Sequence, residues 1–312
     1  LVGFLSLLVS SFWGLVVLRG VMGIALAGFL AVAVAYMADE FSPTALVVAV
    51  GSYISANSLG GIMGRLSGGF MSGHLGWQGA VIAMAIFTTV GALMVYALLP
   101  NQQHFKPSKS SLTSKMSSIV SHLKTPVIWI AMVVGGLNFA LFVNIYSVTT
   151  FRLIAEPFNL PVSIASAIFI CYLAGTFSSR LSGRWANRYS PISGMYLGTS
   201  ITFLGVLVAS IESEITVVLG LLIVSGGAFF THSLAYAWVS RKATHSKAAA
   251  TALYLSHYYI GGSLGGFYLI GCWEYGGWTA VTFGALTLGV LMFFCIYLLG
   301  LKQKGLLKEN AA

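Results

Sequence analysis

The chain has 312 residues, of which 57% are hydrophobic and only 7% are charged. A soluble globular chain carries about a quarter charged residues, so this composition excludes a water-soluble protein and indicates that lipid is its solvent. The formal net charge of +9 does not indicate nucleic-acid binding, because the basic residues lie in short loops between apolar runs. The three cysteines lack the spacing of metal ligands, so we expect neither a metal nor a disulfide framework.

Apolar runs bounded by Gly, Pro and charged residues predict an all-α membrane protein. About 20 apolar residues cross the hydrocarbon core as a helix, and most of these runs reach that length. The first run is incomplete: Leu1 is not an initiator Met and no charged segment precedes it, so we expect the chain to be part of a longer protein. The predicted spans are residues 1–11 (incomplete), 13–38, 45–73, 77–99, 126–150, 162–182, 192–211, 215–240, 248–272 and 278–301.

Residues 100–125 form the one long connection between the predicted spans. They are rich in Ser and Lys and contain Pro100 and Pro107, which predicts a linker between two groups of helices. Basic residues mark the cytoplasmic loops of membrane proteins, and all but Arg19, Arg65 and Arg152 of the 16 Lys and Arg residues fall on the side of this linker. We therefore assign the linker and the C-terminus to the cytoplasm. The expected domains are residues 1–99, 100–125, 126–302 and a tail, 303–312.

An internal repeat relates the two groups of helices. At an offset of 201 residues, the separation of Tyr53 and Tyr254, several Gly, Ser, Tyr and Trp residues coincide, among them Gly76 with Gly277. The paired segments run in the same direction through the membrane, so the repeat is parallel, the relation known for the two halves of major facilitator transporters. The second half has two helices more than the first, which predicts a parent chain of twelve helices with about 75 further residues before Leu1.

Arg19 lies inside the predicted span 13–38. An Arg within a bilayer costs about 3 kcal/mol, so its side chain must face protein or water. The run from Leu15 to Ala27, with Arg19 and Gly23, resembles the fourth-helix motif of the major facilitator superfamily in its drug/proton antiporter branch, although Met22 replaces the usual Gln. The resemblance implies a role for Arg19 in proton coupling. The alternative is that Arg19 only binds carbonyls of a neighbouring broken helix.

Gly60, Gly64, Gly68 and Gly69 follow in the next span and resemble the antiporter motif of the same branch. Glycines four residues apart allow another helix to approach closely, and Gly261, Gly262 and Gly265 repeat part of the pattern in the second half. Arg65 stands where the family motif has Pro, which removes the expected kink and leaves the direction of transport open.

A third likeness lies in the run Gly183-Arg184-Trp185-Ala186-Asn187-Arg188, which resembles the cytoplasmic loop motif of the superfamily. Asn187 replaces the usual Asp, which weakens the charge network of that loop. Asp39, with the neighbouring Glu40, would be the natural ion-pair partner of the corresponding loop in the first half.

Short sequence segments, such as residues 11–14, 53–57 and 256–259, resemble the YnfM-like inner-membrane transporters of bacteria. The resemblance extends over nearly the whole chain. This resemblance implies a major facilitator fold of two parallel six-helix repeats, of which the first two helices and most of the third would be missing here. It also implies a multi-pass exporter in the bacterial inner membrane with a central cavity. The residues expected along the substrate and proton pathway are Arg19, Asn57, Arg65, Asn138, Asn144, Tyr146, His232, Tyr236 and His257.

His232 and His257 can exchange protons near neutral pH, which suits a proton relay, although an isolated His in a helix is more often a neutral hydrogen-bonding residue. No Asp or Glu lies inside a predicted span, so we expect the proton-carrying carboxylate of the parent protein upstream of Leu1.

The sequence favours secondary transport over enzymatic chemistry. It has no Ser/His/Asp set, HExxH run or phosphate-binding loop, so we expect no enzyme and no cofactor, with a proton gradient as the energy source. The favoured function is proton-coupled efflux of small molecules by alternating access. The alternatives are a proton- or ion-coupled uptake symporter and a membrane sensor or scaffold on a transporter fold. The expected partners are the lipid bilayer and a small-molecule substrate, and we expect a monomer.

Overall fold

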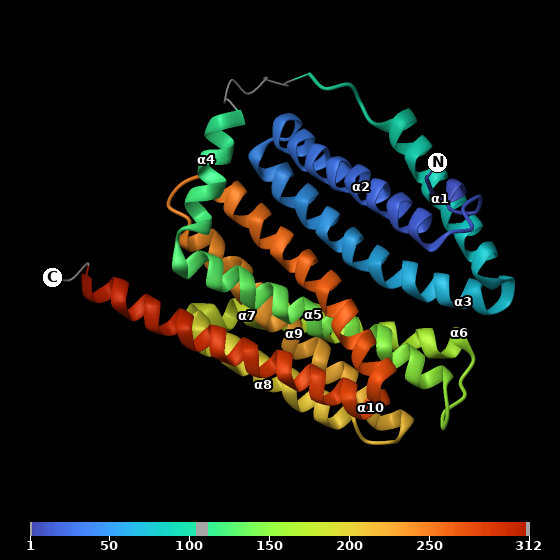
Figure 1. Cartoon of the computed structure of the whole chain (residues 1–312). Helices are drawn as coiled ribbons and strands as arrows, with labels where there is room; N and C mark the ends of the chain where they lie inside the picture. Colours follow the sequence, from blue (N-terminus) through green and yellow to red (C-terminus); the bar gives the residue numbers. More distant parts are fainter. Residues whose placement is uncertain (1, 104–111, 310–312) are drawn as a thin grey trace. The chain divides into compact units, whose positions relative to one another are not determined.

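The computed structural model describes residues 2–103 and 112–309, in which every regular element is a helix (Figure 1). By length and composition, seven helical segments of this part of the chain can cross a membrane. The short elements are α1 (Val2–Leu5), α4 (Leu112–Leu123), α6 (Val162–Ala165) and the 3-10 helix η1 (Ser166–Cys171). The long helices are α2 (Phe12–Glu40), α3 (Pro43–Leu98), α5 (Pro126–Ile154), α7 (Tyr172–Arg188), α8 (Pro191–Ala209), α9 (Glu214–Lys242) and α10 (Lys247–Glu309).

The two longest helices, α3 and α10, each change direction at a glycine. Gly76 has φ 68° and Gly277 has φ 58°, in the left-handed region that Gly adopts without a steric penalty. Each glycine separates two of the predicted spans, so α3 and α10 each contain a pair of them. The two glycines are related by the offset that pairs Tyr53 with Tyr254, so the two turns fall at equivalent positions of the predicted repeat.

Helix starts follow signals that are visible in the sequence. The hydroxyl oxygens of Ser42 and Ser190 accept hydrogen bonds from the first-turn N–H groups of α3 and α8, at 3.4 and 3.3 Å. A Pro occupies the first turn of both helices, and of α5 as well. Because the first N–H groups of a helix have no partner within the helix, a Ser cap satisfies one of them and a Pro removes another.

Three segments differ from the prediction. Within residues 2–11 only α1 is helical, and it is followed by a turn. The predicted linker contains α4, a helix of 12 residues. Its Ser- and Thr-rich sequence has a low helix propensity and does not predict a helix, but tertiary contacts can outweigh this propensity. The span predicted to end at residue 182 continues through α6, η1 and α7 as far as Arg188.

The chain separates into two compact units. Unit 1 comprises Leu1–Lys109 and Pro161–Phe169, and unit 2 comprises Ser110–Leu160 and Ile170–Ala312. Within unit 1, α6 packs against α3. Large apolar side chains of α2, such as Trp13 and Ile24, are exposed within the described structure, as expected of a helix that meets lipid or other membrane-embedded segments.

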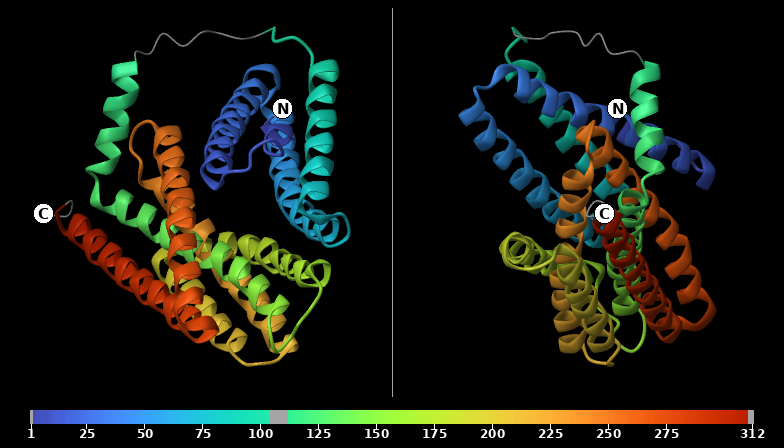
Figure 2. Two further views of the ribbon diagram at one scale, coloured as in Figure 1. Left: turned by 45° about the vertical axis from the view of Figure 1, so that its right-hand side comes forward. Right: turned by 90° about the vertical axis from the view of Figure 1, so that its left-hand side faces the viewer.

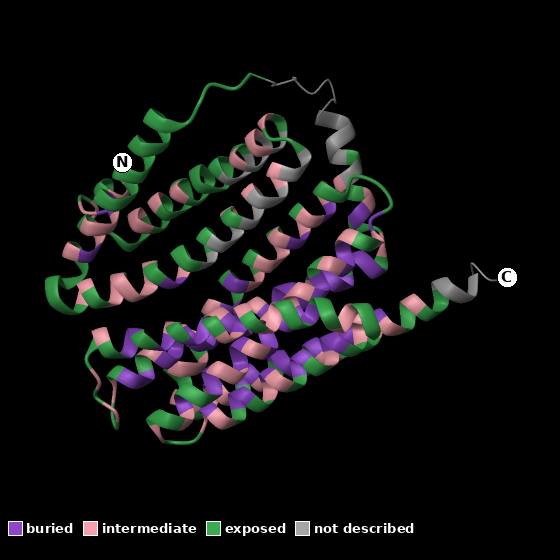
Figure 3. Ribbon diagram, turned by 180° about the vertical axis from the view of Figure 1, so that it is seen from behind, coloured by how far each residue is buried: buried purple, intermediate pink, exposed green. Residues whose placement is uncertain are grey.

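Unit 2 contains the main core. Within it α5 packs along α10 and α8 packs along α9 (Figure 2), and the buried residues gather on these helices (Figure 3). Met132, Met195, Trp238, Tyr254 and Ile296 meet in one apolar cluster that draws on α5, α8, α9 and α10. This core fixes the helices that carry most of the predicted pathway residues.

Candidate functional site

Two predicted pathway residues, Asn138 and Asn144, lie on α5 and are buried between helices. The amide nitrogen of Asn138 donates to the carbonyl of Ala228 on α9 at 3.1 Å, and that of Asn144 donates to the carbonyl of Gly262 on α10 at 2.8 Å. Each amide therefore joins α5 to a neighbouring helix, a role that the residue type does not reveal. The Oδ1 atom of Asn138 is buried and has no hydrogen-bond partner within residues 2–103 and 112–309, so it keeps an acceptor for water or a ligand.

Tyr146 lies two residues after Asn144 on α5 and is also buried. Its ring is fully buried, and its hydroxyl donates to the carbonyl of Leu221 at 2.9 Å and lies 2.7 Å from the hydroxyl of Ser225. A buried hydroxyl with two partners on one neighbouring helix fixes the spacing of the two helices. The structure thus assigns Tyr146 to the contact of α5 with α9.

His232 on α9 is the centre of an aromatic cluster. Its Nδ1 atom lies 3.0 Å from the hydroxyl of Tyr254 on α10, and its ring centroid lies 4.3 Å from that of Tyr258. Tyr236, one turn further along α9, packs edge-on against Tyr254 at 5.5 Å and is exposed on its other side. The predicted residues His232 and Tyr236 are therefore brought together, with two tyrosines of α10 that were not predicted to belong to the pathway.

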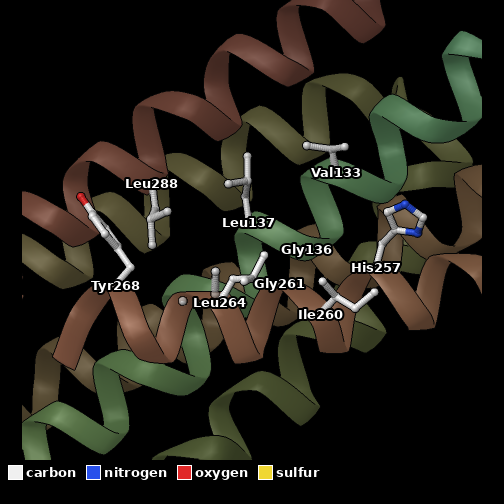
Figure 4. Close-up of a pocket in the computed structure, with 11 residues that line it drawn as sticks. Val133, Gly136, Leu137, His257, Ile260, Gly261, Leu264, Tyr268 and Leu288 are labelled. Atoms are coloured by element: carbon white, nitrogen blue, oxygen red, sulfur yellow. The ribbon is translucent and has the colours of Figure 1, made fainter. Parts of the chain in front are cut away.

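His257 lies on α10, three residues after Tyr254. Its Nδ1 atom is 2.8 Å from the carbonyl of Leu253, and its ring lines an apolar cavity of about 290 Å³ between α5 and α10. Figure 4 shows His257 at one end of this cavity and Tyr268 near the other, with Leu137 and Leu264 between them. The cavity is nearly without polar groups, so an apolar molecule or an apolar side chain suits it.

The predicted packing glycines of the second half form a close helix contact. A Cβ atom on Gly261 would collide with the backbone of Gly136 on α5, and one on Gly265 would lie 2.5 Å from the Cα of Ala140. A Cβ on Gly262 would meet the ring of Phe139 at the same distance. These absent side chains let α5 and α10 touch backbone to backbone.

In the first half only part of the glycine pattern is used within the described structure. A Cβ on Gly69 would collide with the side chain of Ser166 of unit 1, and one on Gly64 would meet Met84 at 3.9 Å. A Cβ on Gly23, Gly60 or Gly68 would meet no described atom within 4 Å.

Arg65 lies beside these glycines. It donates to the carbonyl of Gly61 at 2.9 Å, and its guanidinium lies 5.5 Å from the ring centroid of Phe169. Arg19, Asn57 and Asp39 are exposed in unit 1. Glu40, beside Asp39, accepts a hydrogen bond from the backbone N–H of Gln103 at 2.7 Å, so this carboxylate holds the segment that follows α3.

The cytoplasmic loop motif falls on the last two turns of α7. Gly183, Arg184, Asn187 and Arg188 are all exposed, and the last three line a groove of about 890 Å³ between α7, α8 and α9.

Two contacts of unit 2 were not predicted. Arg152, near the end of α5, donates to the carbonyl of Ala209 at 2.8 Å, and its guanidinium lies 4.4 Å from the ring centroid of Trp278. His122 of α4 stacks on His245, which lies in the loop between α9 and α10. Both contacts join segments that are far apart in the chain, so no local sequence pattern predicts them.

The membrane-spanning helices, the two glycine turns at one repeat offset and the polar groups within the spans define a multi-pass helical membrane protein. The sequence profile of the Major Facilitator Superfamily matches residues 1–266, and the chain belongs to this superfamily. The membership in this superfamily that the motifs around Arg19 and Gly60 predicted is thereby confirmed.

Named relatives are membrane transporters. The chain is 33% identical over 256 residues to the uncharacterized MFS-type transporter YybF of Bacillus subtilis, covering 82% of this chain and 63% of that protein. It is 30% identical over 281 residues to the inner membrane transport protein YnfM of Escherichia coli, covering 89% and 66%. It is 31% identical over 301 residues to an uncharacterized transporter of Buchnera aphidicola, covering 95% and 71%. The chain thus spans 63–71% of the length of these relatives.

A solved structure shares the fold. A bacterial homologue of the human lysosomal transporter Spinster, in an inward-facing and unoccupied conformation, superposes with a TM-score of 0.68 at 18% identity. The match covers 96% of this chain and 78% of that chain. The predicted major facilitator fold is confirmed.

Proposed function

We propose that this membrane transporter exports small molecules in exchange for protons, by alternating access of its two halves, and that His232 carries the proton within the described part of the chain. Membership in the superfamily supports transport, and the likeness to YnfM supports the inner membrane as its location. The observation that carries proton coupling is the contact of His232 with Tyr254, which places a titratable group within a hydrogen-bonded cluster of membrane-spanning helices.

The distribution of titratable groups supports His232 over other proton carriers in this sequence. All seven Asp and Glu residues lie at or beyond the ends of the predicted spans, as Asp39 and Glu214 do. His257 has its Nδ1 on a carbonyl of its own helix and faces an apolar cavity. The Nδ1 of His232 instead contacts the hydroxyl of Tyr254. A Tyr hydroxyl can both donate and accept a hydrogen bond, so a proton can pass between the two groups.

The experiment measures proton movement in everted membrane vesicles that contain the protein expressed from its complete reading frame. A pH-sensitive dye reports loss of the imposed proton gradient when compounds from a panel of lipophilic toxic cations and anions are added. We expect at least one compound to release protons from the vesicles. His232→Gln should reduce that release at least tenfold, since Gln keeps a polar side chain but carries no proton.

The matched control is His74→Gln, because His74 is exposed on α3 and its ring contacts the carbonyl and the ring of Phe70 on its own helix. This control should keep the wild-type proton release. Unchanged release in His232→Gln would remove His232 from the mechanism. Proton movement with the opposite sign would identify an uptake symporter. A folded protein that responds to no compound of the panel would favour the sensor or scaffold.

A further inference from the structure

The groove between α7, α8 and α9 of unit 2 lies apart from the aromatic cluster around His232. Its volume, about 890 Å³, falls within the range of small-molecule sites in proteins. Its lining divides into two chemically different ends. One end is cationic and the other is apolar, which is the pattern of an amphiphile and not that of a free inorganic anion.

The cationic end holds Arg184 and Arg188, which lie one helical turn apart on α7 and therefore point to the same side. Both side chains are exposed, and neither has an ion pair or hydrogen bond within the described residues. Asn187, which also lines the groove, is the position at which the related loop motif carries Asp. Because this Asn brings no negative charge, the two guanidinium groups keep an uncompensated double positive charge.

The apolar end is formed by residues of three membrane-spanning helices. Leu181 of α7 is 51% exposed and Leu197 of α8 is 37% exposed, and the buried Phe230 of α9 also lines the groove. Directly after Arg184 and Arg188 in the chain, the rings of Trp185 and Tyr189 pack with their centroids 4.6 Å apart. Trp and Tyr collect where a membrane meets water, so this pair marks the depth at which a lipid headgroup would lie.

We propose that this groove binds an anionic phospholipid of the cytoplasmic leaflet. The lipid phosphate pairs with Arg184 and Arg188, and an acyl chain lies against Leu181, Leu197 and Phe230. The inference depends on the cytoplasmic position of the loop after α7, which its three Arg residues indicate. It does not depend on the transported substrate or on the coupling ion, and it holds or fails without reference to His232.

The test is native mass spectrometry of the full protein released from nanodiscs of phosphatidylethanolamine that are titrated with phosphatidylglycerol. Each basic side chain near an anionic lipid contributes about fivefold in affinity, so Arg184→Gln with Arg188→Gln should weaken phosphatidylglycerol binding about thirtyfold. The control is Arg180→Gln with Arg241→Gln, which removes the same charge from two exposed residues outside the groove lining. We expect this control to stay within about twofold of the wild-type affinity.

A second variant tests the apolar end without altering charge. Gly226 of α9 lines the groove, and a Cβ on it would meet nothing within 4 Å, so Gly226→Leu fills the groove and leaves the helix packing intact. We expect it to reduce phosphatidylglycerol binding although both arginines remain. Thermal unfolding midpoints equal to that of the wild type verify that each variant is folded.

Three results would overturn the proposal. The first is wild-type phosphatidylglycerol binding in both groove variants. The second is an equal loss in the control pair, which would show that only the general surface charge matters. The third is displacement of the lipid by soluble glycerol phosphate at equal concentration, which would show that the site recognises a phosphate anion and makes no use of its apolar end.

Discussion

The imidazole rings of His122 on α4 and His245 in the loop between α9 and α10 stack on each other, with centroids 4.6 Å apart and planes inclined by 13°. His122 is almost completely buried, and its Nε2 lies 3.3 Å from the carbonyl of Ser246. The hydroxyl of Ser121 lies 2.7 Å from Nε2 of His245. This group of contacts fastens the end of α4 to the rest of unit 2.

His245→Ala should therefore loosen α4. It removes one hydrogen bond to α4 and one ring contact with α4, worth about 1 kcal/mol each, so amide hydrogen exchange over residues 117–123 should accelerate by about tenfold or more. The measurement is hydrogen exchange followed by mass spectrometry in detergent. His74→Ala, on α3, is the control and should leave exchange in α4 unchanged. Identical exchange in the two variants would show that the stack does not hold α4.

Gly261→Ala should disrupt the contact of α5 with α10. The added methyl group collides with the backbone of Gly136, and rigid backbone cannot move aside as a side chain would, so we expect a loss of about 2 kcal/mol or more. The measurement is the thermal midpoint and the monodisperse fraction in detergent. Gly271→Ala on the same helix is the control, because a Cβ there meets nothing within 4 Å. Equal midpoints for the two variants would contradict the close contact.

Tyr146→Phe tests the hydroxyl between α5 and α9. The change keeps the ring and removes the group that contacts Leu221 and Ser225, which should cost about 1–2 kcal/mol and lower the thermal midpoint. Tyr96→Phe is the control, since Tyr96 is 88% exposed. In a double-mutant cycle with Ser225→Ala, the two losses should be smaller together than their sum. Full additivity would show that Tyr146 and Ser225 do not interact.

Arg19→Ala addresses the expectation that this residue takes part in proton coupling. In the complete protein we expect proton release in the vesicle assay to fall at least tenfold while the amount of inserted protein stays unchanged. Arg19→Lys separates charge from geometry, because Lys keeps the charge but lacks the planar fork of Arg. Wild-type proton release in Arg19→Ala would remove Arg19 from the mechanism and leave it a structural residue.

The sequence predicts most of the fold because the fold follows local rules. Apolar runs of sufficient length mark the spans. Gly76 and Gly277, which the repeat offset relates, mark the turns between them. The spacing of small residues around Gly261 also predicts the close approach of another helix, although it does not predict that this helix is α5. These features depend on a few neighbouring positions in the chain, so one sequence is enough to predict them.

The contacts that the sequence did not predict depend on partners that are distant in the chain. Nothing near Asn144 predicts that its amide binds the carbonyl of Gly262, which is 118 residues away. The stack of His122 on His245, and the helix α4 that carries His122, likewise cannot be predicted from the neighbouring sequence. The predicted pathway therefore mixes residues that hold helices together, such as Asn144, with residues that face one another across a cluster, such as His232.

The glycine turns also constrain how the protein enters the bilayer. At Gly277 the chain reverses within one or two residues, and Gly76 does the same in α3. Such a turn carries no Lys or Arg and is too short to be retained on one side of the membrane by its own charge. The orientation of each helical hairpin therefore depends on the charged residues at its outer ends, such as Arg241 and Lys242 before α10 and Lys302 near its end, and not on the turn between its two spans.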